Sequence, residues 1–410
     1  MTITDLQPQR LWKEFDAITR IPRPSKKEGK IIAYLQEFGK KHNLETRTDA
    51  AGNVLICKPA TKGYEDKPTV ILQSHMDMVC EKNNDTVHDF ENDPIQTYVD
   101  GEWLKAKGTT LGADNGIGMA AELAILASDD LKHPALECLF TVDEETGLTG
   151  AFAIDPNLLK GQLLINLDSE DDGQFFIGCA GGIDTTVTFT YKKEEMPEGL
   201  YYFTINVSGL KGGHSGGDIH LNRGNANKIL NRFMWQVAQK TELRISSICG
   251  GNLRNAIARE ASAVCAVPTD FKHELTIMLN KFAAEIEGEL SISDPGVKIA
   301  IDSCNKPEYM IDKETAHKLI YSIYACPHGV LRMSDDMPGL VETSTNLAAI
   351  KMQGDNEILI TTSQRSSTES SKRDAAYMVE SVFVLAGAKA THGDGYPGWA
   401  PNPNSKVLKV

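Results

Sequence analysis

The spacing of apolar residues divides the chain into regions of different predicted structure. Residues 11–42 read as two amphipathic helices, separated at residues 21–29 by a turn that contains two prolines. From about residue 53 to residue 184, short apolar strands alternate with helical stretches, which is typical of a largely parallel α/β sheet covered on both faces. The predicted strands are residues 53–59, 69–79, 135–142 and 163–167, and the predicted helix is 118–128.

After residue 184 the strands show a period of two, which predicts a different kind of domain. Strands are expected at 185–191, 201–210, 244–248, 261–267, 297–303, 345–352 and 357–364, and helices at 226–240, 271–289, 313–325 and 371–387. Strands with two packed helices, used twice, predict a duplicated α+β sandwich. We therefore predict a first domain of residues 1–184 and 391–410, interrupted by an inserted domain of residues 185–390.

Length and composition agree with this division and exclude several classes of protein. A chain of 410 residues exceeds the roughly 250–300 residues at which single cores stop growing. Its net charge of −14 argues against nucleic acid or an anionic membrane surface as a partner. No apolar run approaches the ~18–20 residues of a membrane span, and the N-terminus does not resemble a secretory signal. The eight scattered cysteines are typical of reduced thiols in a cytoplasmic protein.

The strongest chemical signal is the position of acidic residues and one histidine at the ends of predicted strands. In an open α/β sheet, the carboxyl ends of the strands form the edge where ligands bind. Two of the residues are two positions apart in one strand, so their side chains share a face. These residues are His75, Asp77, Asp114, Glu144, Glu145 and Asp168.

One imidazole among several carboxylates predicts a site for zinc, manganese or cobalt. Asp114, Glu145 and Asp168 bring three negative charges against the four positive charges of two divalent ions, which favours two ions over one. Of the pair Glu144–Glu145, one would bind metal and the other would move a proton. The alternative is that these acids are ordinary surface residues and the glycine-rich segment GTTLGADNGIG is a turn; this segment lacks the phosphate-loop pattern.

Five segments together resemble the co-catalytic di-zinc peptidase and aminoacylase group. They are SHMDMVCEKN, GTTLGADNGIG, TVDEETGLTGAF, INLDSE and GLKGGHSGGDIH. Within that group the chain is most similar, over about residues 10–408, to the bacterial aminoacyl-histidine dipeptidases, also called cytosolic non-specific dipeptidases or peptidase D. The resemblance implies a mainly parallel α/β catalytic domain with an inserted α+β lid domain. It also implies a cytoplasmic enzyme that hydrolyses unblocked dipeptides, including Xaa-His, and that dimerises through the lid.

The resemblance assigns a role to each residue at the strand ends. His75 and Asp168 would bind one zinc ion, Asp114 would bridge both ions, and Glu145 would bind the second. Cobalt or manganese would be substitutes for zinc.

The two remaining carboxylates would serve catalysis. Asp77 would orient the imidazole of His75 from behind, as carboxylates commonly do for metal-bound histidines. Glu144 would be the general base, taking a proton from a zinc-activated water and giving it to the leaving amine.

In the lid, three residues are candidates for binding substrate by the same resemblance. His214 would contact the oxyanion or the substrate, and Arg365 would bind the terminal carboxylate, for which a guanidinium is well shaped. Asn255 would be a further contact. Without the family, His214 would be interpreted as structural and Asn255 as a turn residue.

Family members continue beyond the point where this sequence stops, and the continuation carries the last zinc ligand, a histidine. The second zinc would then have only Asp114 and Glu145, because His392 lies in the predicted hinge and is a poor substitute. Two other hypotheses about the function stay open. One is a truncated, non-catalytic remnant with an incomplete metal site. The other is a related amino-acid deacylase or carboxypeptidase.

Overall fold

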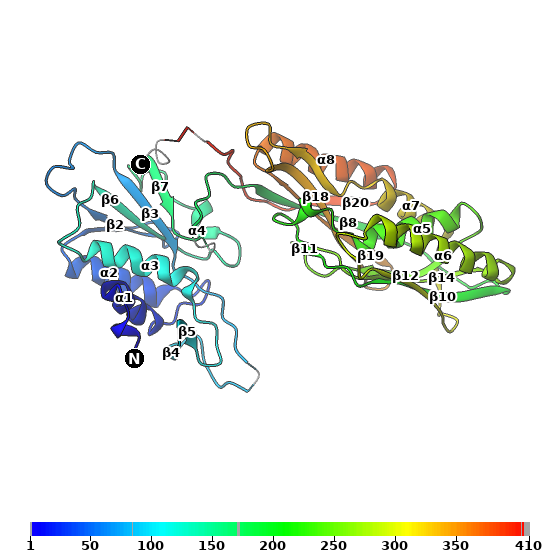
Figure 1. Cartoon of the computed structure of the whole chain (residues 1–410), viewed down its shortest axis with the longest axis horizontal. Helices are drawn as coiled ribbons and strands as arrows, with labels where there is room; N and C mark the ends of the chain where they lie inside the picture. The colour runs from blue at the N-terminus through cyan, green and yellow to red at the C-terminus, as the bar shows by residue number, and fades with distance from the viewer. Residues whose placement is uncertain (1, 84, 170–172, 403, 406–410) are drawn as a thin grey trace. The chain divides into compact units, whose positions relative to one another are not determined.

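A computed structural model describes residues 2–83, 85–169, 173–402 and 404–405. The described residues form two compact units, which meet in the sequence between Phe175 and Phe176 (Figure 1). Unit 1 contains the N-terminal residues, and unit 2 contains the residues from Phe176 onwards. The candidate metal residues of the sequence all belong to unit 1.

Unit 1 is built on a five-stranded sheet with the order β1-β2-β6-β3-β7. Its strands are β1 (Glu45–Thr48), β2 (Val54–Lys58), β3 (Val70–His75), β6 (Leu136–Thr141) and β7 (Leu163–Asn166). Strand β3 pairs in parallel with both β6 and β7, whereas β1 and β2 add two antiparallel pairings at the other edge. Of the four predicted strands, β3, β6 and β7 are therefore parallel and end at the acidic residues, whereas β2 is antiparallel to both of its neighbours.

Helices α1 (Gln9–Thr19), α2 (Gly29–Lys41) and α3 (Ala113–Leu126) pack on one face of this sheet (Figure 1). The opposite face is covered by the short α4 (Thr149–Phe152) and by residues 154–159, where Leu158 packs on Ile71. Because both faces are covered, every residue of β6 is buried. Its sequence LECLFT is apolar at four of six positions, as expected for a strand covered on both faces, and the buried carboxylate of Glu137 accepts hydrogen bonds from the N–H groups of Lys160 and Gly161.

A few short elements of unit 1 were not predicted from the sequence. They are the 3-10 helix η1 (Ile3–Asp5), strand β1, the short helix α4, and a hairpin of β4 (Thr97–Asp100) and β5 (Trp103–Ala106). The hairpin strands alternate between half-buried and exposed residues, so their apolar signal is weak.

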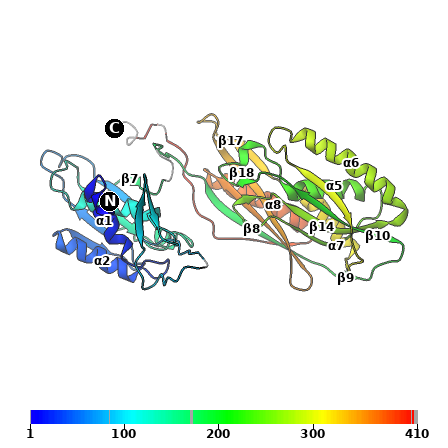
Figure 2. The same ribbon diagram turned by 60° about the horizontal axis from the view of Figure 1, so that its bottom comes forward.

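Unit 2 is built on one nine-stranded sheet with the order β15-β10-β14-β12-β18-β19-β8-β20, and β17 pairs with β18 beside this path. The strands are β8 (Gly181–Thr190), β10 (Leu200–Ser208), β12 (Arg244–Gly250), β14 (Ala261–Pro268), β15 (Lys298–Ser303), β17 (Gly329–Met333), β18 (Val341–Gln353), β19 (Glu357–Ser366) and β20 (Lys389–His392). The helices are α5 (Ala226–Ala238), α6 (Lys272–Glu289), α7 (Lys313–Ala325) and α8 (Glu369–Leu385). They pack with the sheet around one hydrophobic core (Figure 2).

The predicted duplication is visible in how the elements of unit 2 are connected. One half runs β10-α5-β12-β14-α6-β15 and the other runs β8-α7-β18-β19-α8-β20. In both halves the fourth, first, third and second strands lie side by side in that order. The halves join where β12 meets β18. The first half is inserted in the sequence between β8 and α7 of the second. The two halves therefore do not follow one another as a tandem repeat.

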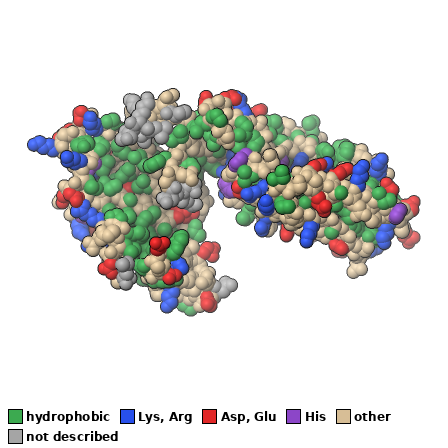
Figure 3. All heavy atoms as spheres, viewed as in Figure 1, with side chains coloured by type: hydrophobic (Ala, Val, Ile, Leu, Met, Phe, Trp, Pro, Cys, Tyr) green, Lys and Arg blue, Asp and Glu red, His purple; other side chains and the backbone are tan. Residues whose placement is uncertain are grey.

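The surface of unit 2 mixes both signs of charge. On the face shown in Figure 3, acidic and basic side chains are interspersed across unit 2. Within the part of the chain that the structure describes, no helix combines the length and the apolar character that crossing a bilayer requires.

A buried carboxylic acid in α3 makes the stability of unit 1 depend on pH. Glu122 is fully buried against β3 and β6, where the hydroxyl of Ser74 donates to its Oε1 at 2.6 Å and Cys138 is its titratable neighbour. Burial raises the pKa of Glu122 well above its ordinary value. The folded chain therefore keeps this proton at a pH where the unfolded chain has released it.

The sign of this effect follows from linkage. Stability from Glu122 is fully present below the unfolded pKa, about 4.3, and is lost as pH rises toward the folded pKa, at up to about 1.4 kcal/mol per pH unit. We expect Glu122→Gln to remove this loss, so urea unfolding at pH 5, 6, 7 and 8 should show a growing advantage of the variant. A difference between the two proteins that stays constant across this range would contradict the prediction.

Candidate metal centre

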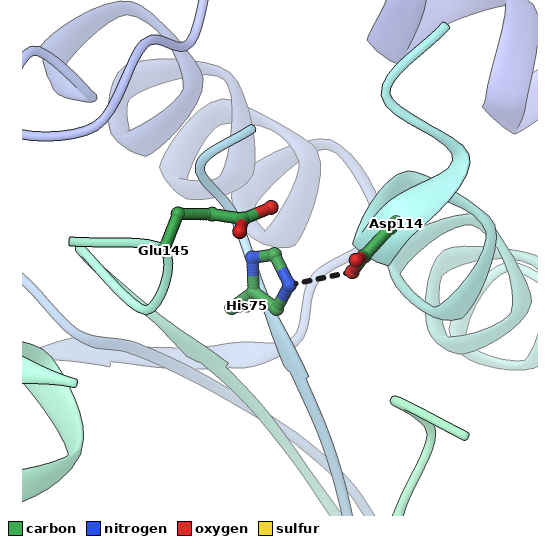
Figure 4. Close-up of side chains that lie close together, drawn as sticks. All are labelled: His75, Asp114 and Glu145. Atoms are coloured by element: carbon green, nitrogen blue, oxygen red, sulfur yellow. Dashed lines mark hydrogen bonds and ion pairs between the residues drawn. The ribbon is translucent and has the colours of Figure 1, made fainter. Parts of the chain in front are cut away.

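His75 is the last residue of β3, and its buried imidazole is held between carboxylates on two sides. Its Nδ1 lies 3.2 Å from Oδ1 of Asp77, and its Nε2 lies 2.9 Å from Oδ1 of Asp114. The strand brings His75 to the carboxyl edge of the sheet, and α3 supplies Asp114 from its first turn (Figure 4). The contact of Nδ1 with Asp77 therefore fixes the orientation of the imidazole, and Nε2 faces the other carboxylates of the site.

Further carboxylates converge on the same nitrogen. Nε2 of His75 is 3.5 Å from Oδ1 of Asp168, which follows β7, and 3.9 Å from Oε2 of Glu144, which follows β6. The possible ligand atoms form two overlapping groups, each within 4.8 Å: His75 with Asp114 and Glu145, and His75 with Glu144 and Asp168. The structure thus brings together all the residues that the sequence placed at the strand ends.

The negatively charged carboxylates of this cluster favour a positive charge between them. Burial alone would lower the pKa of His75, but hydrogen bonds with Asp114, Asp168 and Asp77 raise it to about 12. The carboxylates thus stabilise the protonated, positively charged form of the imidazole. A divalent metal ion meets the same need, and a set of one imidazole and several carboxylates is suited to zinc, cobalt or manganese. The residues present therefore fit a metal centre.

Asp77 holds both the imidazole of His75 and the turn after β6 in place. It is fully buried and accepts hydrogen bonds from the backbone N–H groups of Glu144 (3.0 Å) and Glu145 (3.2 Å) and from the hydroxyl of Ser25 (2.8 Å). Burial opposes its charge, but His75, the Glu144 amide and Ser25 lower its pKa to about 2. One carboxylate thereby fixes both the imidazole and the turn that carries the two glutamates.

The turn after β6 sets the direction of Glu144 and Glu145. Asp143 begins it with a positive φ of 50°, and its carboxylate accepts hydrogen bonds from the hydroxyls of Thr146 and Thr149. Glu144 is partly buried, with 31% of its side chain exposed. Burial, reinforced by Asp168 and Glu145, raises the pKa of Glu144 to about 7 against the opposing effect of His75. A carboxyl group in this range can both accept and release a proton near neutral pH.

The glycine-rich segment shapes the start of α3. Gly112 has a φ of 68°, and Asp114 and Asn115 have non-helical backbone angles within the first turn. Asn115 is buried, and its Nδ2 donates to Oδ1 of Asp168 at 2.7 Å. Asn115 was not predicted as a site residue, although its place directly after Asp114 was a usable signal.

Two of the predicted substrate residues lie close together within unit 2. His214 is in β11 (Gly213–His214), and its Nδ1 accepts a hydrogen bond from the backbone N–H of Gly217 at 3.1 Å. Its Nε2 therefore carries the proton when the ring is neutral. A Cβ on Gly216 would lie 3.2 Å from Cδ of Arg365 and 3.3 Å from Cε1 of His214, so both side chains lie beside Gly216.

The third predicted residue, Asn255, is beside them. It comes just before β13 (Ala256–Ile257), which pairs with β11, and its carbonyl accepts from the N–H of Ser215 at 2.8 Å. Burial and the nearby Arg365 lower the pKa of His214, which keeps the ring neutral near pH 7.

His392 has a structural role in unit 2. It ends β20 rather than lying in a hinge, and its ring nitrogens contact the Thr185 hydroxyl at 2.9 Å and the Glu380 carboxylate at 3.0 Å. Both nitrogens are thus already engaged within unit 2.

Comparison with known proteins places the chain in a family. Residues 205–293, within unit 2, match the sequence pattern of a peptidase dimerisation domain. The chain is 44% identical over 408 residues to the cytosol non-specific dipeptidase of Escherichia coli strain K12, and the alignment covers 100% of this chain and 84% of that protein. The chain belongs to the cytosol non-specific dipeptidase family.

Solved structures agree with this family and with the predicted fold. The aminoacylhistidine dipeptidase of Vibrio alginolyticus superposes with a TM-score of 0.92 at 43% identity, covering 100% of this chain and 83% of that one. A tripeptidase from Staphylococcus aureus superposes with a TM-score of 0.50 at 17% identity, covering 98% of this chain and 80% of that one, and shows the fold alone. The predicted family and fold class are therefore confirmed for this member of the cytosol non-specific dipeptidases.

Proposed function

We propose that this chain is a metal-dependent dipeptidase that hydrolyses unblocked dipeptides, including Xaa-His. The observation that carries the proposal is the convergence of Asp114, Asp168 and Glu144 on Nε2 of His75. The names of the two close relatives, a cytosol non-specific dipeptidase and an aminoacylhistidine dipeptidase, support the same substrate class.

We assign two zinc ions to the carboxylate cluster, with cobalt or manganese as substitutes. His75 and Asp168 would hold the first ion, Glu145 the second, and Asp114 both. Asp114 and Glu145 occur together in one group of ligand atoms, and His75 and Asp168 occur together in the other, which supports this division. When bound, the ions would polarise the scissile carbonyl and stabilise the charge that develops on its oxygen.

Glu144 is the proposed general base and acid. It would accept a proton as the oxygen of water forms its bond to the carbonyl carbon, and return that proton to the amine nitrogen as the C–N bond breaks. Asp77, bonded to Nδ1 of His75, would keep the other nitrogen directed to the metal and would hold Glu144 through its backbone N–H.

We propose that the predicted insertion of residues 185–390, extended to include all of β8 and β20, forms a lid within a catalytic domain made of the residues on either side of it. In the lid, Arg365 would bind the substrate's terminal carboxylate through its guanidinium, and Nε2–H of His214 would donate to the substrate or its oxyanion. Asn255 would be an additional contact. The proximity of Arg365 to His214 supports a shared role in recognition.

We also propose that the protein acts in the cytoplasm and forms a homodimer through the lid. The printed name of the Escherichia coli relative supports the location, and the match of a peptidase dimerisation domain to residues 205–293 supports the assembly. Sedimentation of the purified chain at several concentrations tests the assembly directly.

A substrate panel tests the proposed activity. It compares Ala-His and Ala-Leu with Ala-Ala-His, with the amide of Ala-His and with N-acetyl-alanine. We expect hydrolysis of the two free dipeptides and little hydrolysis of the others. The amide lacks the carboxylate that Arg365 would bind, N-acetyl-alanine lacks the free amine of an unblocked dipeptide, and Ala-Ala-His is one residue longer than a dipeptide. Preferential cleavage of N-acetyl-alanine would instead identify a deacylase, and preferential cleavage of Ala-Ala-His at its C-terminal bond a carboxypeptidase. A folded chain that binds one ion and cleaves none of the panel would identify a non-catalytic remnant.

A further inference from the structure

A buried arginine lies behind the candidate metal centre. Arg23, in the turn between α1 and α2, has 2% of its surface exposed. Its Nη1 donates hydrogen bonds to the carbonyls of Met76 at 3.1 Å and Asp77 at 2.7 Å, and its Nη2 donates to the carbonyl of Gly112. A guanidinium presents several donors in a rigid fork, so it can join backbone groups that belong to different loops.

The three carbonyls belong to the two loops that carry metal-ligand candidates. Met76 and Asp77 directly follow His75, and Gly112 lies two residues before Asp114. These loops are far apart in the sequence and start from different elements, β3 and α3. Arg23 therefore cross-links the loop of His75 to the loop of Asp114, whose side chains meet at 2.9 Å.

The glycine-rich segment is shaped around this guanidinium. A Cβ on Gly112 would lie 2.6 Å from Nη2 of Arg23, and a Cβ on Gly116 would lie 2.7 Å from the same atom. Both contacts are closer than real Cβ atoms approach their neighbours, so a side chain at either position would displace the guanidinium. Two glycines of GTTLGADNGIG thus leave room for Arg23.

The same turn contacts the third loop of the site. The hydroxyl of Ser25 donates to Oδ2 of Asp77, and Oε1 of Glu28 accepts from the N–H of Asp143, which begins the turn of Glu144. Burial lowers the pKa of Arg23 to about 10, against the opposing charges of nearby acids, so the guanidinium stays charged at neutral pH. Its free energy of burial is offset by these hydrogen bonds and by the acids around it.

We propose that Arg23 is a positioning residue for the metal centre, holding the loops of His75 and Asp114 at the separation that a shared metal ion requires. The inference rests on the proposed function, because it concerns metal held by these two residues. It predicts that loss of the cross-link weakens metal binding even though Arg23 contacts no ligand atom of the cluster.

The first test is Arg23→Lys in the full chain. Lysine keeps the positive charge but offers a single ammonium group, which cannot reproduce the fork. We expect the affinity for Co²⁺ and Zn²⁺, measured by competition with a chromophoric chelator, to fall by about 10–100-fold, the range typical of residues that support metal ligands. The visible absorption spectrum of bound Co²⁺ should also change, because it reports the geometry of the ligands.

Arg244→Lys is the matched control. Arg244 is also 2% exposed, but it pairs with Glu194 in unit 2. Its replacement should lower stability without changing metal affinity or the Co²⁺ spectrum. The comparison separates a specific effect on the metal centre from the general cost of altering a buried arginine.

A second variant covers the case in which Arg23→Lys does not fold. Gly116→Ala displaces the guanidinium without removing it, and Gly29→Ala is its control, because a Cβ on Gly29 meets nothing within 4 Å. We expect weaker metal binding in Gly116→Ala alone. Wild-type metal affinity and Co²⁺ spectrum in the folded variants would overturn the role of Arg23. A wild-type chain that binds no metal would overturn the metal assignment itself and this proposal with it.

Discussion

Replacing Glu144 by Gln is expected to reduce kcat by about 10²–10⁴-fold while the metal content stays unchanged. Glutamine has nearly the same size as glutamate, and the backbone N–H that bonds to Asp77 is unaffected, so the turn should keep its shape. The amide cannot accept a proton, however, and the water would lose its base. The measurement is kcat for Ala-His at saturating substrate, with metal content determined on the same sample.

The control for this variant is Glu102→Gln, which changes an exposed glutamate in the β4–β5 hairpin of unit 1. It should leave kcat within about twofold of wild type, as surface substitutions away from special features usually do. The proton-transfer role would be wrong if Glu144→Gln kept wild-type kcat with its metal bound. A variant that lost metal along with activity would instead move Glu144 into the ligand set.

Asp114→Asn is expected to abolish activity for a different reason, because it removes metal. Asp114 is the carboxylate closest to Nε2 of His75 and the proposed bridge between the two ions. Asparagine has the same shape but no charge, so the cluster loses one negative charge and one bridging oxygen. We expect metal affinity to fall more than the roughly 10–100-fold seen for supporting residues.

The measurement is metal bound per chain after dialysis against a fixed concentration of free Zn²⁺. Asp129→Asn, at an exposed position after α3, is the matched control and should bind metal as the wild type does. Together with Glu144→Gln, this experiment separates the two halves of the proposed chemistry. Retention of both ions by Asp114→Asn would remove the bridging role from Asp114.

Much of the site was predictable because it follows from sheet geometry. His75, Glu144, Glu145 and Asp168 each come at the end of an apolar strand, and parallel strands place their carboxyl ends at one edge. Asp114 required one further step, since it comes from the first turn of α3 rather than from a strand.

What could not be predicted depends on contacts between a side chain and backbone carbonyls that are distant in the sequence. Arg23 lies 53 and 54 residues from two of its acceptors and 89 residues from the third, and these acceptors are carbonyls that every residue possesses. No sequence pattern marks such a partner. For the same reason the sequence does not reveal that Gly112 and Gly116 of the segment GTTLGADNGIG leave room for this guanidinium.

The fold shows a similar limit. The helices and strands with strong apolar periodicity were predicted, including most of both halves of the duplication in unit 2, whereas β17, β20 and the β4–β5 hairpin were not. The strands of this hairpin are short and alternate between half-buried and exposed residues, so their apolar signal is weak, but Gly101 at the first position of the two-residue turn was a usable hairpin signal. The nesting of the two halves could not be read from the sequence, because it depends on which strands pair.

In the proposed function, metal ions held by the carboxylates of unit 1 are required for dipeptide hydrolysis. The most direct test follows zinc content and Ala-His hydrolysis together in the wild-type chain, first during removal of metal with a chelator and then during stepwise return of Zn²⁺. This requirement predicts that activity falls to background as zinc is removed and returns in proportion to zinc, with the highest activity at two ions per chain. Full activity in the chain after its metal has been removed would contradict it.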